Sequence, residues 1–181
     1  MPRQQPWVVP LGTDTRGVQH DQVAPTRILR TWAVPQLGTD DSVQLDLATT
    51  VLGGGKTSRL YQRLVYQDKL ADDVSVSIST FALSSRVQLS VDVKQGVDPA
   101  KVEAAIAQVW SEFLAKGPTD DELERAKVAN LAGFVRGLEK VGGFGGKAVI
   151  LAEGQVYRND PEAYRKDLER SQQATAASVL A

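Results

Sequence analysis

The sequence has 181 residues, enough for one domain with its own hydrophobic core. Its 21 basic and 22 acidic side chains give a net charge of −1, so charge gives no reason to expect a nucleic acid or an anionic membrane as a partner. Cysteine is absent and His20 is the single histidine. This composition argues against disulfides and against a metal site in this chain. No apolar run predicts a membrane span, and the first residues do not resemble a secretory signal.

The first half of the chain predicts a linker, a strand and two helices. Residues 1–24 are rich in proline, glycine and polar side chains, which is typical of an extended linker or entry segment. The run 27–34 has strand composition. Apolar residues then recur at helical spacing in 40–52 and again from about 57 to 67. The triple glycine at 53–55 joins these helices, at a position where a helix end favours residues that adopt positive φ.

The second half predicts a hairpin and then several helices. Val74, Val76 and Ile78 alternate with serines, and the run 87–93 repeats this alternation, which predicts an antiparallel pair buried on one face. Helix-capping residues follow at Asp98, Thr119, Asp160 and Thr175. Because strands and helices are segregated, we expect an α+β fold, an antiparallel sheet with helices packed on one face. The domain is expected to span 25–181 and to be truncated at its C-terminus.

The sequence Gly55-Lys56-Thr57 matches the end of a phosphate-binding P-loop. That motif also requires an earlier glycine, at the position that Thr50 holds, in a loop that follows a strand. The residues before Thr50 have helical spacing instead. Nucleotide binding through Lys56 therefore stays a remote alternative, and an ATP titration would test it.

The stretch from Leu52 to Tyr61, LGGGKTSRLY, resembles the LGGG-x-[ST]-S-R-L-[FY] signature of the M16 metallopeptidases, the family of insulinase, pitrilysin and mitochondrial processing peptidase. Three later segments, 117–127, 142–148 and 159–161, are similar to further segments of the family and of its bacterial members. The resemblance covers roughly residues 24–181. The signature residues are Gly53, Gly54, Gly55, Ser58, Arg59 and Leu60.

The resemblance implies that two homologous domains have different roles in the enzyme. M16 enzymes pair homologous α+β domains around a chamber, and the domain with His-x-x-Glu-His binds zinc and hydrolyses the peptide. This sequence contains no His-x-x-Glu-His. It therefore resembles the non-zinc, C-terminal type of domain, without metal ligands or catalytic residues of its own. The parent protein is then expected to be a zinc metalloendopeptidase, with the zinc in a partner domain.

Active members of the family place an arginine and a tyrosine shortly after the signature, where these side chains hold the substrate backbone and the oxyanion. Aligned on the glycines, these positions fall on Val65 and Asp72, and neither side chain donates the required hydrogen bond. Tyr66 lies next to the first of these positions, and a shift of one residue would bring it inward. The resemblance thus implies that Val65, Tyr66 and Asp72 mark the substrate-facing region.

Two interpretations stay open at this point. In the first, the chain encloses a peptide substrate together with a homologous zinc-bearing M16 domain of the same chain or of another subunit. In the second, it is a non-peptidase scaffold or assembly domain of the same family. The resemblance implies the periplasm, although the cytoplasm is also compatible, and the chain on its own is a candidate homodimer.

Overall fold

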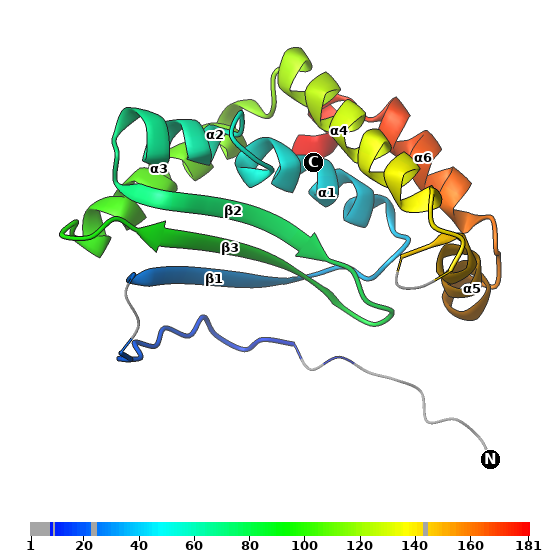
Figure 1. Cartoon of the computed structure of the whole chain (residues 1–181), viewed down its shortest axis with the longest axis horizontal. Helices are drawn as coiled ribbons and strands as arrows, with labels where there is room; N and C mark the ends of the chain where they lie inside the picture. Colours follow the sequence, from blue (N-terminus) through cyan, green and yellow to red (C-terminus); the bar gives the residue numbers. More distant parts are fainter. Residues whose placement is uncertain (1–7, 9, 23–24, 143–144) are drawn as a thin grey trace.

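The structure, a computed structural model, describes residues 8, 10–22, 25–142 and 145–181. Within these residues, three strands form one antiparallel sheet in the order β1-β3-β2 (Figure 1). The strands are β1 (Arg27–Val34), β2 (Ala71–Ser79) and β3 (Ser85–Val93). The predicted strand 27–34 and the predicted hairpin are thereby confirmed, with β2 beginning three residues earlier than its apolar alternation.

The two faces of the sheet differ in the way that the alternation predicts. Val76 and Leu89 are paired across β2 and β3, and both are buried on the face that carries the helices. Ser75 and Ser77 point to the other face and are exposed. Side chains of successive strand residues point to opposite faces, so a period of two gives one apolar and one polar surface. The sheet is therefore buried on one side.

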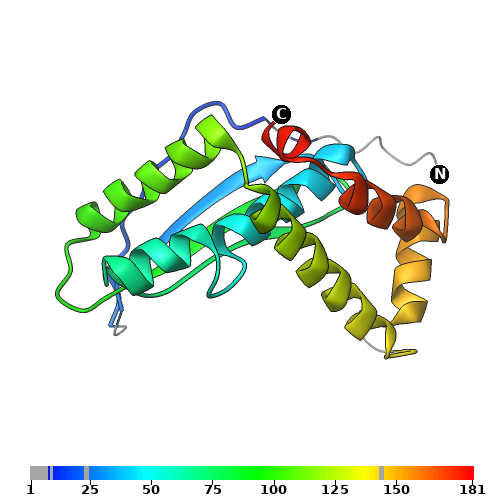
Figure 2. The ribbon, with the colours of Figure 1, turned by 90° about the horizontal axis from the view of Figure 1, so that it is seen from above.

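The helices lie on the apolar side of the sheet, some between the first two strands in the sequence and the rest after the third. Their bounds are α1 (Asp40–Gly53), α2 (Arg59–Tyr61), the π-helix η1 (Gln62–Gln67), α3 (Pro99–Lys116), α4 (Asp120–Leu138), α5 (Lys147–Arg158), α6 (Ala163–Gln173) and α7 (Ala176–Leu180). Figure 2 shows α4, α5 and α6 as three sides of a triangular frame at one end of the molecule. The expected α+β fold, with helices on one face of an antiparallel sheet, is confirmed.

The core lies between the sheet and the first helices. Its fully buried side chains come from α1, α2, η1, β3 and α3 and include Leu47, Leu60, Leu64, Leu89 and Ile106. At the β1 edge, Trp32 stacks on Trp110 of α3 with ring centroids 4.9 Å apart. Stacked aromatic pairs of this kind stabilise beyond the area that they bury. The stack therefore packs β1 against α3.

The helix after the triple glycine differs from the regular helix that the spacing predicts for 57–67. Three residues of α2 are followed by a π-helical turn, in which Asp68 N–H donates to the Arg63 carbonyl, five residues earlier, at 2.9 Å. A π-turn contains one residue more than the corresponding α-helical turn. Side chains after Tyr61 are therefore rotated relative to a regular helix.

The leading segment, described at residue 8 and at residues 10–22, contains no helix or strand. Its Arg16 donates two hydrogen bonds to Glu103 of α3, at 3.1 and 2.9 Å. The rest of the predicted linker, residues 1–7, 9 and 23–24, lies outside the described residues.

α6 begins at Ala163 rather than at Asp160, because Asn159 ends α5 in a left-handed conformation and a short turn follows.

Candidate functional site

Gly53 is the last residue of α1 and lies directly against β2. A Cβ atom at this position would be 2.4 Å from the Val76 backbone nitrogen and 2.5 Å from the Val76 Cγ2. Real side chains do not tolerate such distances, so only glycine lets the end of the helix approach the strand this closely. The first glycine of the signature is thus required by helix–sheet packing.

The next two glycines end the helix and turn the chain. Gly54 N–H donates to the Thr50 carbonyl at 2.9 Å, and Gly55 has a φ of +122°, a conformation that favours glycine. A helix therefore precedes the Gly-Lys-Thr sequence, where a P-loop would follow a strand. Lys56 is exposed in this turn. The local structure does not have the form of a phosphate-binding loop.

Ser58 and Arg59 connect the signature to the rest of the domain. The buried Ser58 hydroxyl donates to the Gly55 carbonyl at 2.6 Å and closes the turn. Arg59 Nε and Nη2 donate to the two carboxylate oxygens of Glu122, at 2.8 and 2.6 Å. The same Nη2 donates to the Gly117 carbonyl at 2.8 Å, and the guanidinium lies 5.3 Å from the Phe113 ring centroid. Arg59 thus holds the start of α4 and the end of α3 on α2.

The ion pair of Arg59 with Glu122 is charge-assisted and largely shielded. About a fifth of each side chain is exposed, with 20% for Arg59 and 19% for Glu122. The hydrogen bonds from Arg59 lower the pKa of the Glu122 carboxyl to about 2, and Glu122 in turn raises the pKa of Arg59. Glu122 also accepts from Thr119 N–H at 2.8 Å as part of the capping box of α4. The carboxylate therefore serves the cap and the ion pair together.

The three residues that the resemblance assigns to the substrate-facing region have different environments. Val65 is partly buried and packs against the core, so it does not present a free surface. Tyr66 is 62% exposed, and its ring lies 6.1 Å from that of Tyr61 in a tilted arrangement. Asp72 is exposed near the start of β2. Tyr66 therefore faces away from the core, whereas Val65 lies against it.

Asp72 has a feature that the sequence did not reveal. Ala71 pairs with Val93 and Asp73 pairs with Asp92, so Asp72 is the extra residue of a β-bulge. A bulge redirects the side chain of the extra residue and breaks the pairing locally. No turn residue marks it in the sequence, which explains why the alternation pattern starts only at Val74.

Zinc does not fit the residues of this chain. In the part of the chain that the structure describes, no group of three or more His, Cys, Asp or Glu side chains could hold a metal ion. The whole sequence has one histidine and no cysteine, the residues that zinc sites use most.

None of the described helices is long and apolar enough to cross a membrane.

Comparisons with known families agree with the geometry. The family described as the peptidase M16 inactive domain matches residues 2–130. The chain belongs to this family. Its signature glycines and the ion pair of Arg59 with Glu122 thus lie within the part that defines an M16 inactive domain. A comparison with curated proteins found no match.

Solved structures share this fold. A protease from Helicobacter pylori has a TM-score of 0.76 and 20% identity, with 89% of this chain and 38% of that chain covered. The inactive peptidase domain of a candidate zinc protease from Bordetella parapertussis has a TM-score of 0.75 and 23% identity, with 88% and 83% covered. A peptidase M16 inactive domain from Pseudomonas fluorescens has a TM-score of 0.70 and 19% identity, with 87% and 37% covered. This M16 inactive domain spans less than half of the chain from Helicobacter pylori.

The predicted non-catalytic M16 domain is therefore confirmed, whereas the roles of Val65, Tyr66 and Asp72 stay predictions. Sequence reasoning missed the contact of Asp46 in α1 with Asn130 in α4, where Asn130 Nδ2 donates to Asp46 Oδ2 at 2.7 Å. Both residues look like ordinary polar positions of surface helices. Only the packing of α4 on α1 brings them together, and no signal in the sequence predicts it.

Proposed function

We propose that this M16 inactive domain encloses a peptide substrate opposite a homologous zinc-bearing domain and binds that substrate through Tyr66. The proposal rests on the exposed phenol of Tyr66, which lies within the π-helical turn. π-turns occur frequently at functional sites because they reorient one side chain within a helix. A phenol hydroxyl is a hydrogen-bond donor for a peptide carbonyl or for the oxyanion that forms on it.

Asp72 complements this donor. Its carboxylate is exposed at a bulge, and such a group accepts hydrogen bonds from substrate N–H groups. A negative charge beside a developing oxyanion would oppose the reaction, so we assign Asp72 to backbone binding away from the scissile carbonyl. The zinc of the partner domain, when bound, supplies the activated water. The residues of this chain bind and orient the peptide.

The test combines this chain with the zinc-bearing domain of its parent protein or partner subunit and follows cleavage of an internally quenched peptide. We expect the chain alone to bind no stoichiometric zinc and to cleave nothing, and its addition to raise kcat/KM of the zinc-bearing domain. Tyr66→Phe should lower that value by at least about tenfold, since one oxyanion donor is lost. Tyr157→Phe, at an exposed tyrosine of α5, is the matched control.

Two results would contradict the proposal. Tight zinc binding by the chain alone would contradict its assignment as the non-zinc partner. Equal cleavage with the wild-type chain and with Tyr66→Phe would remove the role of Tyr66.

A scaffold function is the second candidate, and exposed apolar side chains on the outer helices favour it. Val128 and Val135 of α4 and Val156 of α5 are between 53% and 72% exposed. Apolar side chains that form one contiguous patch on a surface mark protein interfaces. A stable complex of the assembled parent protein that cleaves no peptide would favour the scaffold over the peptidase.

A further inference from the structure

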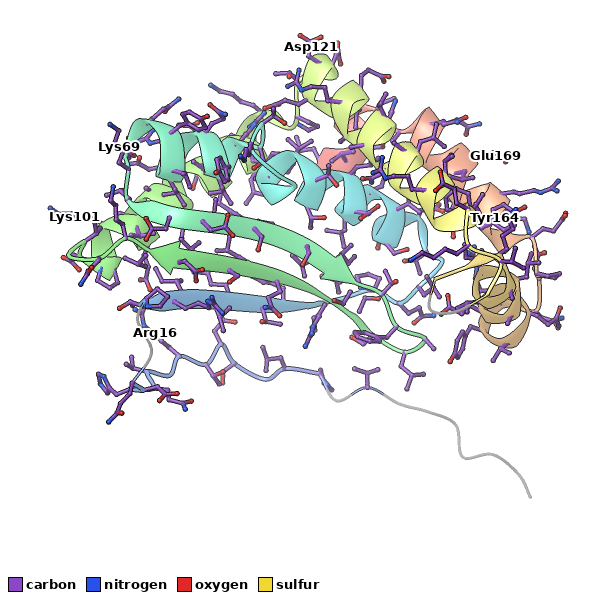
Figure 3. All side chains as sticks on the ribbon, viewed as in Figure 1. Arg16, Lys69, Lys101, Asp121, Tyr164 and Glu169 are labelled. Carbon is purple, nitrogen blue, oxygen red and sulfur yellow. The ribbon has the colours of Figure 1, made fainter. Side chains whose placement is uncertain are left out.

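A cavity of about 600 Å³ lies between α1, α4, α6 and the end of β2. Its volume falls within the range of small-molecule sites, about 300–1,000 Å³. Figure 3 marks Tyr164, which lines the cavity from α6 and stacks on Phe134 of α4 with ring centroids 5.7 Å apart. The walls are mostly apolar and include Leu37, from the loop before α1, together with Val43, Ile78, Leu131, Phe134 and Leu168 from the four elements.

One carboxylate in this cavity has unused hydrogen-bonding capacity. Asp46 Oδ2 accepts from Asn130 Nδ2 at 2.7 Å, and Thr50 Oγ1 lies 3.2 Å from Asn130 Oδ1, which fixes the orientation of the amide. Asp46 Oδ1 accepts no hydrogen bond from the residues that the structure describes. The side chain is exposed, yet the surrounding protein raises the pKa of the carboxyl by desolvation. A group that is both accessible and surrounded by protein lies in a concave site.

The other charges that line the cavity are balanced. Lys127 donates to Glu124 at 2.8 Å, and Asp167 accepts from Arg158 and, at 3.2 Å, from Arg170. Within the described part of the chain, Asp46 is thus the lining carboxylate whose hydrogen-bond partner is a neutral amide. A negative charge without a cationic partner in partly desolvated surroundings favours a cationic ligand.

We propose that this cavity binds an organic ammonium group on an apolar or aromatic body, with the ammonium at Asp46 and the body between Phe134 and Leu168. The ammonium supplies the donor that Asp46 Oδ1 lacks, and the apolar walls bury the body. The site contains neither Tyr66 nor Asp72, so ligand binding there is tested separately from the proposed peptidase function. Its ligand is either a small free amine or the ammonium group of a peptide.

The test titrates the full chain with phenethylamine, 2-phenylethanol and phenylacetate, followed by calorimetry or by amide chemical shifts. The three ligands share one body and differ in the polar group. We expect phenethylamine to bind at least about tenfold more tightly than the alcohol, because a hydrogen bond between charged groups replaces a neutral one. Phenylacetate should bind most weakly, since its charge repels that of Asp46.

Two variants locate the site. Asp46→Asn should weaken phenethylamine by about tenfold or more while leaving 2-phenylethanol nearly unchanged. Asp41→Asn, at an exposed aspartate of the same helix, is the matched control and should change neither affinity. Leu131→Trp should weaken both ligands by filling the cavity without altering its charge. Circular dichroism checks the fold of each variant.

A tripeptide amide with an N-terminal phenylalanine, free or acetylated, distinguishes the two sources of the ammonium. If the free tripeptide binds more tightly than phenethylamine and acetylation abolishes its binding, the natural ligand is a peptide. If phenethylamine binds more tightly than the free tripeptide, the natural ligand is a small amine. Equal affinities for the amine and the alcohol would overturn the proposal. The absence of saturable binding at millimolar ligand would also overturn it, as would an affinity that neither Asp46→Asn nor Leu131→Trp changes.

Discussion

Replacing Glu122 by glutamine removes the charge of the ion pair with Arg59 and keeps the shape of the side chain. The glutamine oxygen remains an acceptor for Thr119 N–H, so the cap of α4 is retained. The lowering of the Glu122 pKa from 4.5 to about 2 corresponds to about 3 kcal/mol of stability when the carboxylate is ionised. Because 19% of this side chain is exposed, screening by solvent reduces the effect, and we expect a loss of about 2 kcal/mol at pH 7.

The pH dependence provides the sharper check. A carboxylate with a lowered folded-state pKa stabilises the fold above its unfolded pKa, here 4.5, and this stabilisation is lost as the pH falls towards about 2. The difference in unfolding free energy between wild type and Glu122→Gln should therefore be constant from neutral pH to just above 4.5. By about pH 3 it should fall to less than half.

Urea denaturation at several pH values, followed by circular dichroism, measures this difference. Glu124→Gln, two residues further along α4, is the matched control, since Glu124 is 67% exposed and pairs with Lys127 at the surface. We expect it to change stability by less than about 0.5 kcal/mol. A Glu122→Gln loss that is the same at pH 3 and pH 7, or that is no larger than the Glu124→Gln loss, would refute this account of the signature arginine.

Two further substitutions test the packing. Gly53→Ala should destabilise the chain by about 2 kcal/mol, because its Cβ would clash with Val76, whereas Gly133→Ala, which has open space in α4, should be neutral or stabilising by up to about 1 kcal/mol. Equal urea midpoints for these two variants would contradict the close approach. Trp110→Ala should cost about 3 kcal/mol and remove the near-UV dichroism of its stack with Trp32, and an unchanged near-UV spectrum would argue against that stack.

The sheet and the helix starts could be predicted from the sequence because short-range patterns determine them. The alternation around Val76 and Leu89 decides which strand residues face the core. Thr119 caps α4 through residues three positions away, as the capping box predicts. In each case the interacting groups lie within a few residues of each other, so the signal is local.

The remaining features depend on long-range contacts, or on local backbone conformations that no sequence pattern predicts. The apolar residues after Arg59 fit an α-helix and a π-turn equally well, so the π-helical turn could not be predicted from spacing. The bulge at Asp72 contains no glycine to mark it. Asp46 and Asn130 are 84 positions apart, and their contact depends on the angle at which α4 crosses α1.

The signature identifies the fold because each of its residues has a structural task. Gly53 allows the approach to β2, and Arg59 joins α2 to α4 and to the Gly117 carbonyl. Each of these contacts is made between residues of this chain. These structural tasks therefore do not require the His-x-x-Glu-His motif, which this sequence lacks. For this reason the stretch LGGGKTSRLY indicates an M16 fold, whereas the roles of Tyr66 and Asp72 stay predictions.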